Sequence, residues 1–145
     1  MQSRHVLVGL MLLLLLTVGL RMGCAPAQHQ LPKTVPVSGT VTYHNKPVPF
    51  GMIVLHPVDA GIQNAGRLPM GQISQGAFRL TTFNLNDGAI PARYRAIVDC
   101  REGGPTPENP RAKTNWIVPE LYAEAKTSPL EVEITLETKE IHLDF

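Results

Sequence analysis

The sequence has few of the residues on which metal centres and disulfide frameworks depend. Its 145 residues contain two cysteines and one tryptophan, and its five histidines show neither a His-x-His nor a His-Glu-x-x-His spacing. Spacings of this kind bring two ligands to one metal ion, so we expect no metal site. No Gly-x-Ser-x-Gly motif occurs, and no serine has a base and an acid in a fixed relation to it. We therefore expect no catalytic residues, no cofactor and no enzymatic activity.

Positive charge is also scarce once the first 23 residues are set aside. Those residues hold Arg4 and Arg21 and no acidic residue, so 11 lysines and arginines face 12 aspartates and glutamates in the remainder, a formal net charge of −1. Nucleic-acid binding depends on clustered basic residues, and the sequence has no such cluster. We expect no nucleic-acid partner.

Long apolar runs are limited to one, from Val6 to Leu20. It follows a short basic start, contains no charge, and gives way to Arg21 and a small residue, Gly23. This is the three-part layout of a secretory signal. A transmembrane helix needs about 20 apolar residues, and the run is shorter than that. The pattern predicts a signal peptide over residues 1–23.

Cys24 stands directly after the small residue at the end of this segment. The arrangement resembles the lipobox of bacterial lipoproteins, in which the thiol receives a diacylglyceryl group and becomes the mature N-terminus. The resemblance implies a lipidated Cys24, a membrane partner through the lipid anchor, and a place in the cell envelope outside the cytoplasm. Arg21 stands where the lipobox usually has an aliphatic residue, so ordinary secretion and an uncleaved anchor remain as alternatives.

Residues 24–34 join the expected anchor to the rest of the chain. The segment has two prolines and no hydrophobic periodicity, which is typical of a flexible linker. Fully extended, its ten residues after Cys24 span about 35 Å. A domain on this tether would stay near the membrane, so its partner would lie on the membrane or in the wall material beside it.

From Val35 onward the apolar residues repeat with a period of two, which indicates half-buried strands. Prolines and glycines fall mainly between these runs and disfavour long helices. The pattern predicts an all-β sandwich domain over residues 35–145. Cys100 ends an alternating apolar run and is expected to be a buried thiol, with a Cys24–Cys100 disulfide as the alternative. The expected strands, about seven in number, are 35–43, 52–56, 70–74, 77–82, 93–100, 130–137 and 141–145.

The segment 84–88, Asn-Leu-Asn-Asp-Gly, has residue types that favour turns. It lacks the later acidic ligand of an EF-hand loop. We interpret it as a turn, and calcium binding is the alternative.

Several motifs occur in an order that resembles carboxypeptidase regulatory-like domains, which are transthyretin-like sandwiches. The chain is similar in particular to small bacterial envelope lipoproteins that carry one such domain, and the similarity covers nearly all of 35–145. It implies an Ig-like Greek-key fold and a non-catalytic accessory or binding module. The motifs are Val-Ser-Gly-Thr-Val-Thr-Tyr at 37–43, Lys-Pro-Val-Pro at 46–49, His-Pro at 56–57, Gly-Ala-Phe-Arg-Leu-Thr-Thr at 76–82 and Asp-Gly-Ala-Ile-Pro-Ala-Arg-Tyr at 87–94.

The stretch 101–128 is long for a connection within a compact domain, and long connections tend to be functional or disordered. Its second part holds the sole tryptophan, and we expect a helical turn near Pro119. Trp116 and Tyr122, with Arg111 and Lys113 nearby, form a candidate binding patch for an envelope glycan or protein. The alternative is that both rings cover an edge of the sandwich as part of the core.

These patterns together favour a non-catalytic, membrane-anchored lipoprotein whose sandwich binds or spaces another envelope component. Two alternatives remain. One is a structural or assembly subunit that pairs through an edge strand, and the other is an accessory domain to a separate envelope enzyme.

Overall fold

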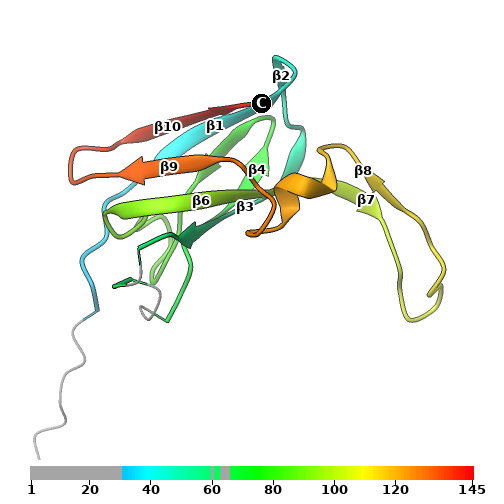
Figure 1. Cartoon of the computed structure of the whole chain (residues 1–145), viewed down its shortest axis with the longest axis horizontal. Coiled ribbons are helices and arrows are strands. Elements are labelled where there is room, and N and C mark those ends of the chain that lie inside the picture. The colour runs from blue at the N-terminus through cyan, green and yellow to red at the C-terminus, as the bar shows by residue number, and fades with distance from the viewer. Residues whose placement is uncertain (1–30, 60, 63–65) are drawn as a thin grey trace, which may run out of the picture. The chain divides into compact units, whose positions relative to one another are not determined.

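Strands make up most of the regular structure in the computed structural model, which describes residues 31–59, 61–62 and 66–145 (Figure 1). The predicted signal peptide, Cys24 and most of the tether lie outside these residues. No helix within the described ranges has the length and apolar character that a membrane span requires. The elements are β1 (Ser38–Tyr43), β2 (Lys46–Pro47), β3 (Phe50–Pro57), β4 (Met70–Ser74), β5 (Ala77–Arg79), β6 (Ala92–Asp99), β7 (Arg101–Gly103), β8 (Thr114–Trp116), the 3-10 helix η1 (Glu120–Ala123), β9 (Glu131–Ile134) and β10 (Glu140–Asp144).

Seven of these strands form one path through the main sheet, in the order β10-β1-β5-β4-β3-β6-β9, with β2 paired to β1 at the side. Neighbours run antiparallel except β1 and β10, which are parallel. The sheet curls so that its two ends enclose a common interior (Figure 1). Strands β3, β4 and β5 are consecutive neighbours, and β6 returns to lie beside β3, which is a Greek-key connection. The predicted all-β Greek-key sandwich of about seven strands is confirmed.

The period-two pattern places one face of each strand in the core, as β-structure requires. On β6 the alternate residues Tyr94, Ala96 and Val98 are at most 1 % exposed, and Cys100 continues the series. Cys100 is a buried free thiol, and burial raises its pKa. The other main core residues are Val37, Val41, Val48, Ile53, Leu55, Ile73, Phe78, Leu80, Ala89, Val118, Ile134, Ile141 and Leu143.

One expected inward position is wrong. The alternation over 130–137 places Leu136 with Ile134 on the core side, yet Leu136 is 71 % exposed. Strand β9 ends at Ile134 because a turn follows, in which the Thr135 N–H donates to Thr138 Oγ1 at 2.9 Å and the Thr138 N–H donates back to the Thr135 carbonyl at 3.3 Å. The apolar period continued by chance into the turn that leads to β10.

The connection from β5 to β6 contains the expected turn at 84–88. Asp87 organises it, because its carboxylate accepts hydrogen bonds from the backbone N–H groups of Thr82 at 2.7 Å, Phe83 at 3.0 Å and Asn84 at 2.9 Å. Burial alone would raise the pKa of Asp87, but these N–H donors together outweigh it and lower the pKa. The next residue, Gly88, has a φ of +85°. The carboxylate of Asp87 is thus engaged by the loop's own backbone.

Candidate functional site

Trp116 lies at the end of β8, in the two-stranded hairpin β7–β8 that extends away from the main sheet (Figure 1). It is paired in register with Arg101, whose guanidinium carbon lies 5.3 Å from the centroid of the indole ring. Arg101 also forms an ion pair of 3.2 Å with Asp99. A guanidinium at this distance from an indole face makes a cation–π contact. Trp116 therefore belongs to a small polar cluster at the base of the hairpin.

Tyr122 belongs to a different cluster. It lies on η1, and its ring centroid is 4.4 Å from that of Phe145 and 6.4 Å from that of Tyr43. These rings pack against the hydrophobic core. For Tyr122 the structure agrees with the alternative that the ring covers an edge of the sandwich. No contact between described aromatic rings joins Trp116 to this cluster.

Arg111 and Lys113 lie on the connection between β7 and β8, and both are exposed. Neither takes part in an ion pair with another described residue. Lys113 comes directly before β8. The structure therefore places Arg111, Lys113 and Trp116 on one hairpin and puts Tyr122 elsewhere, while glycan or peptide binding by them stays a prediction.

A cleft of about 340 Å³, which the sequence did not predict, lies beside β2, and we call it the β2 cleft. One wall consists of Tyr43, His44 and the segment 46–49, and the other consists of Ile117 and Val118. The two walls are about 70 residues apart in the sequence, so no local pattern could bring them together. The one sequence feature that could have pointed to this cleft is the Lys-Pro-Val-Pro run at 46–49, because its two prolines make a stiff apolar segment beside a lysine.

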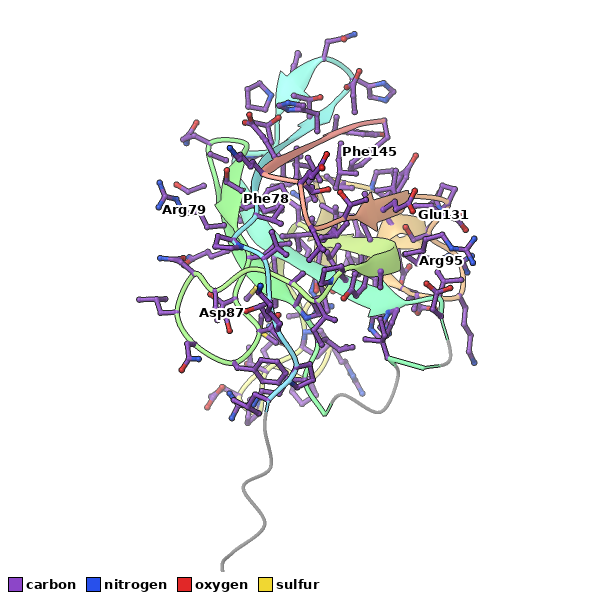
Figure 2. All side chains as sticks on the ribbon, turned by 90° about the vertical axis from the view of Figure 1, so that its left-hand side faces the viewer. Phe78, Arg79, Asp87, Arg95, Glu131 and Phe145 are labelled. Carbon is purple, nitrogen blue, oxygen red and sulfur yellow. The ribbon has the colours of Figure 1, made fainter. Side chains whose placement is uncertain are left out.

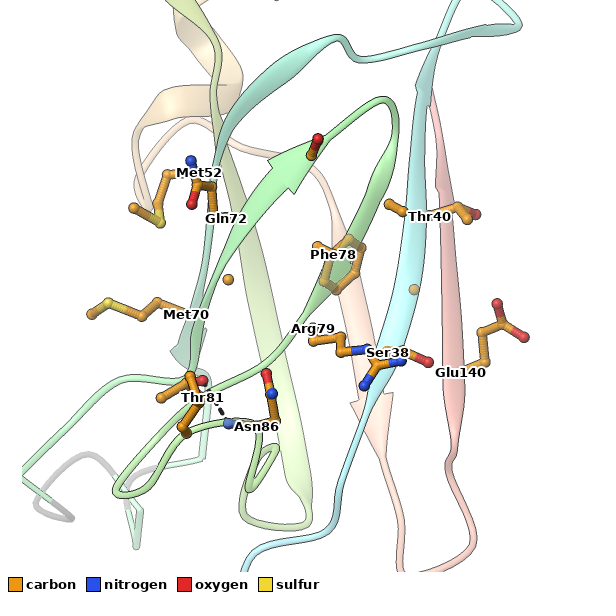
Figure 3. Close-up of a pocket in the computed structure, with 15 residues that line it drawn as sticks. Ser38, Thr40, Met52, Met70, Gln72, Phe78, Arg79, Thr81, Asn86 and Glu140 are labelled. Atoms are coloured by element: carbon orange, nitrogen blue, oxygen red, sulfur yellow. Dashed lines mark hydrogen bonds between the residues drawn. The ribbon is translucent and has the colours of Figure 1, made fainter.

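A wider, open groove of about 740 Å³ lies over the outer face of β1, β3, β4 and β5. In Figure 3 its apolar side chains Met52 and Met70 lie on one side, Arg79 in the middle and Glu140 on the opposite side. Met52 and Met70 are 40 % and 45 % exposed. Because the lining carries charges of both signs, its electrostatics favour neither an anion nor a cation.

Several polar side chains that could carry chemistry are engaged in holding the fold. The buried Ser128 hydroxyl donates to the Ala96 carbonyl at 2.6 Å, and the Tyr94 hydroxyl donates to the Ile90 carbonyl at 2.6 Å. Burial raises the pKa of Tyr94 to about 12, with a smaller contribution from the charge of Asp59. In the part of the chain that the structure describes, no group of three or more His, Cys, Asp or Glu side chains is arranged to hold a metal ion.

Ion pairs on the outer face tie neighbouring strands together. Arg95 on β6 and Glu131 on β9 are 3.1 Å apart, and Figure 2 shows both at the same side of the molecule. Arg95 also donates to the Ala125 carbonyl at 3.3 Å, which holds the segment after η1 against β6. Exposed pairs of this type contribute little to stability individually. The hydrogen bond from Arg95 to Ala125 positions the connection between η1 and β9.

Comparison of the chain with known protein families, with curated proteins and with solved structures found no match in any of the three.

Proposed function

We propose that this chain is a non-catalytic lipoprotein of the bacterial cell envelope, anchored to the membrane by a lipid on Cys24. Its sandwich would be a carboxypeptidase regulatory-like domain that binds or spaces another envelope component outside the cytoplasm. The proposal combines the leader and cysteine of the sequence with the fold of residues 32–145.

The observation that carries the proposal is the point at which the sandwich begins. Residues 31–33 are exposed and have no regular structure, and the first backbone pairing among the described residues is the bridge between Val35 and Ala89, with N–O distances of 2.8 and 3.0 Å. In the sequence, ten residues separate Cys24 from Val35, a reach of about 35 Å if extended. That length suits a domain held close to the surface in which its lipid is inserted.

The non-catalytic role is supported by what the polar side chains do. Asp87, Ser128 and Tyr94 each hold a loop or a strand connection by short hydrogen bonds. A catalytic group has to remain available to a substrate, whereas these groups are engaged with the backbone. The proposal of a carboxypeptidase regulatory-like domain rests on the order of the sequence motifs at 37–43, 46–49, 56–57, 76–82 and 87–94.

The anchor is tested by fractionating cells that produce the chain or its Cys24→Ala variant. We expect the unchanged chain in the membrane fraction and the variant in the soluble fraction. Cys100→Ala is the matched control, because Cys100 is buried and should leave the partitioning unchanged. The intact mass of the mature N-terminus then separates lipidated, cleaved and uncleaved forms. Unchanged membrane partitioning of Cys24→Ala would refute the anchor.

Binding is tested with the β7–β8 hairpin. The double variant Arg111→Glu, Lys113→Glu and the single variant Trp116→Ala should each lower retention of the chain on purified envelope glycan. The matched control is Lys139→Glu, a charge reversal of an exposed lysine between β9 and β10. Equal retention of the unchanged chain, the double variant, Trp116→Ala and Lys139→Glu would show that the hairpin is not the binding surface. Co-purification of the chain with an envelope enzyme would favour the role of an accessory domain instead.

The alternative of assembly through an edge strand has weaker support. The outward residues of β9 and β10, which end the sheet, are mostly charged: Glu131, Glu133, Glu140, His142 and Asp144. Charged side chains on edge strands oppose pairing with a second sheet. A single monomeric species in sedimentation at high concentration is the result we expect.

A further inference from the structure

The β2 cleft has walls that are fixed before any ligand arrives. The Val48 N–H donates to the Val41 carbonyl at 3.1 Å, and the Val48 carbonyl accepts from the Gly76 N–H at 2.7 Å. Opposite, the N–H groups of Ile117 and Val118 both donate to the Cys100 carbonyl, at 3.1 and 3.3 Å. A site whose backbone is already ordered loses less entropy on binding than a mobile one.

The floor and sides of the cleft are apolar. Val48 and Val118 are 1 % and 0 % exposed and form its base, while Pro47 and Pro49 stiffen the rim. The Tyr43 ring forms one side of the cleft and packs against the Phe145 ring, with 5.7 Å between the centroids. The Phe145 ring packs in turn against Tyr122 on η1. A volume of about 340 Å³ lies within the range of small-ligand sites, near its lower end.

The side chains that line the cleft are basic or uncharged. Its lining contains Lys46 and His44 and no aspartate or glutamate. Both side chains are exposed, and among the described residues neither forms an ion pair. The His44 N–H is occupied by the Phe145 carbonyl at 2.8 Å, which fixes its backbone at the rim. A cation at the mouth of an apolar cleft is complementary to an anionic head on an apolar body.

We propose that the β2 cleft binds an apolar group that ends in a carboxylate, with the apolar part against Val48 and Val118 and the carboxylate at Lys46. This site adjoins the base of the β7–β8 hairpin, since Ile117 follows Trp116, but its lining includes none of Arg111, Lys113 and Trp116. It does not depend on the lipid anchor. The same chemistry is offered by two sources, the C-terminal residue of a peptide and a free aliphatic acid.

The test is isothermal titration calorimetry on the full chain held in phospholipid nanodiscs, with empty nanodiscs as the blank. N-acetylphenylalanine represents the peptide terminus, and its amide has the same shape without the charge. We expect the acid to bind at least about fivefold more tightly than the amide at low salt, with the difference reduced in high salt. Acetate, butyrate and hexanoate form the second arm, in which each added methylene should raise affinity about three- to fourfold. The arm with the higher affinity identifies the source.

Two charge reversals complete the experiment. Lys46→Glu should abolish the preference for acid over amide, and because Lys46 is exposed the variant should unfold at the same temperature as the unchanged chain. Lys139→Glu changes the net charge equally but lies by Ser38, at the opposite end of β1 from Tyr43, and should keep the preference. Equal binding of acid and amide, no dependence on chain length, or the same loss in both variants would each overturn the proposal.

Discussion

Asp87 is the residue whose replacement tests the loop between β5 and β6 most directly. Its two carboxylate oxygens accept three backbone N–H groups at 2.7 to 3.0 Å. In Asp87→Asn one oxygen becomes an NH2 group, which cannot accept, so at least one of the three N–H groups loses its acceptor and the others lose the charge on theirs. Hydrogen bonds to a charged acceptor contribute about 1.5 to 3 kcal/mol each. Because the loop is partly exposed and water can replace some contacts, we expect a loss of about 2 to 3 kcal/mol in the free energy of unfolding, a drop of roughly 10 °C in Tm.

The effect should depend on pH in a defined direction. The pKa of Asp87 is lowered in the folded chain, so its carboxylate stabilises the fold fully above the unfolded value near pH 4. That contribution is lost as the pH falls through the lower pKa of the folded state. The difference in stability between the unchanged chain and Asp87→Asn should therefore be largest near pH 6 and shrink toward pH 2.

The measurement is urea unfolding of both proteins at pH 6 and at pH 2.5, followed by the fluorescence of Trp116. Asp144→Asn is the control, because Asp144 is exposed and accepts one hydrogen bond, from the Thr42 hydroxyl at 2.6 Å. It should change stability by no more than about 0.5 kcal/mol. A difference for Asp87→Asn that stays constant with pH, or one no larger than the control's, would show that the carboxylate does not organise the loop.

Two further substitutions address the same region of the fold. Gly88→Ala would place a Cβ against the Val35 carbonyl oxygen at a backbone φ of +85°, so we expect the free energy of unfolding to fall by several kcal/mol, or the chain to fail to fold. Gly66→Ala is the control, because Gly66 has nearly the same φ and nothing within 4 Å of the added Cβ, and it should lower the free energy of unfolding by only about 1 kcal/mol in thermal unfolding. Equal losses in the two variants would contradict the steric argument. Tyr94→Phe removes the hydrogen bond to Ile90 and should cost about 1 to 2 kcal/mol, measured by urea unfolding. Because the pKa of Tyr94 is raised to about 12, the unchanged chain should lose stability relative to Tyr94→Phe as the pH rises above 10, and a constant difference up to pH 12 would refute that shift.

The strands and their buried faces could be predicted from the sequence because they follow from local alternation. A period of two assigns each side chain to one face of a pleated strand, and Tyr94, Ala96, Val98 and Cys100 are all buried as that rule predicts. The rule failed at Leu136, where side-chain hydrogen bonds in a turn ended the strand although the apolar period went on. Alternation cannot report where pairing stops.

The candidate patch was predicted only in part for a related reason. Trp116 and Tyr122 are six residues apart, and that separation says nothing about direction once the chain leaves a strand and enters a 3-10 helix. Trp116 remains on the hairpin beside Arg101, whereas Tyr122 turns onto Phe145 at 4.4 Å. The partners of the two rings come from residues 15 and 23 positions away, beyond any local pattern.

The sequence by itself determined an apolar N-terminal run followed by a cysteine, a proline-containing segment at 25–34, an all-β domain, the turn at 84–88 and a buried Cys100. The tertiary structure alone decided the parallel pairing of β1 with β10, the separation of the two aromatic clusters and the β2 cleft. The physical reason is the separation along the chain over which each kind of interaction acts. Strand periodicity and turn chemistry act between near neighbours, while the cleft requires segments about 70 residues apart to meet, and that meeting depends on how the whole sheet curls around its core.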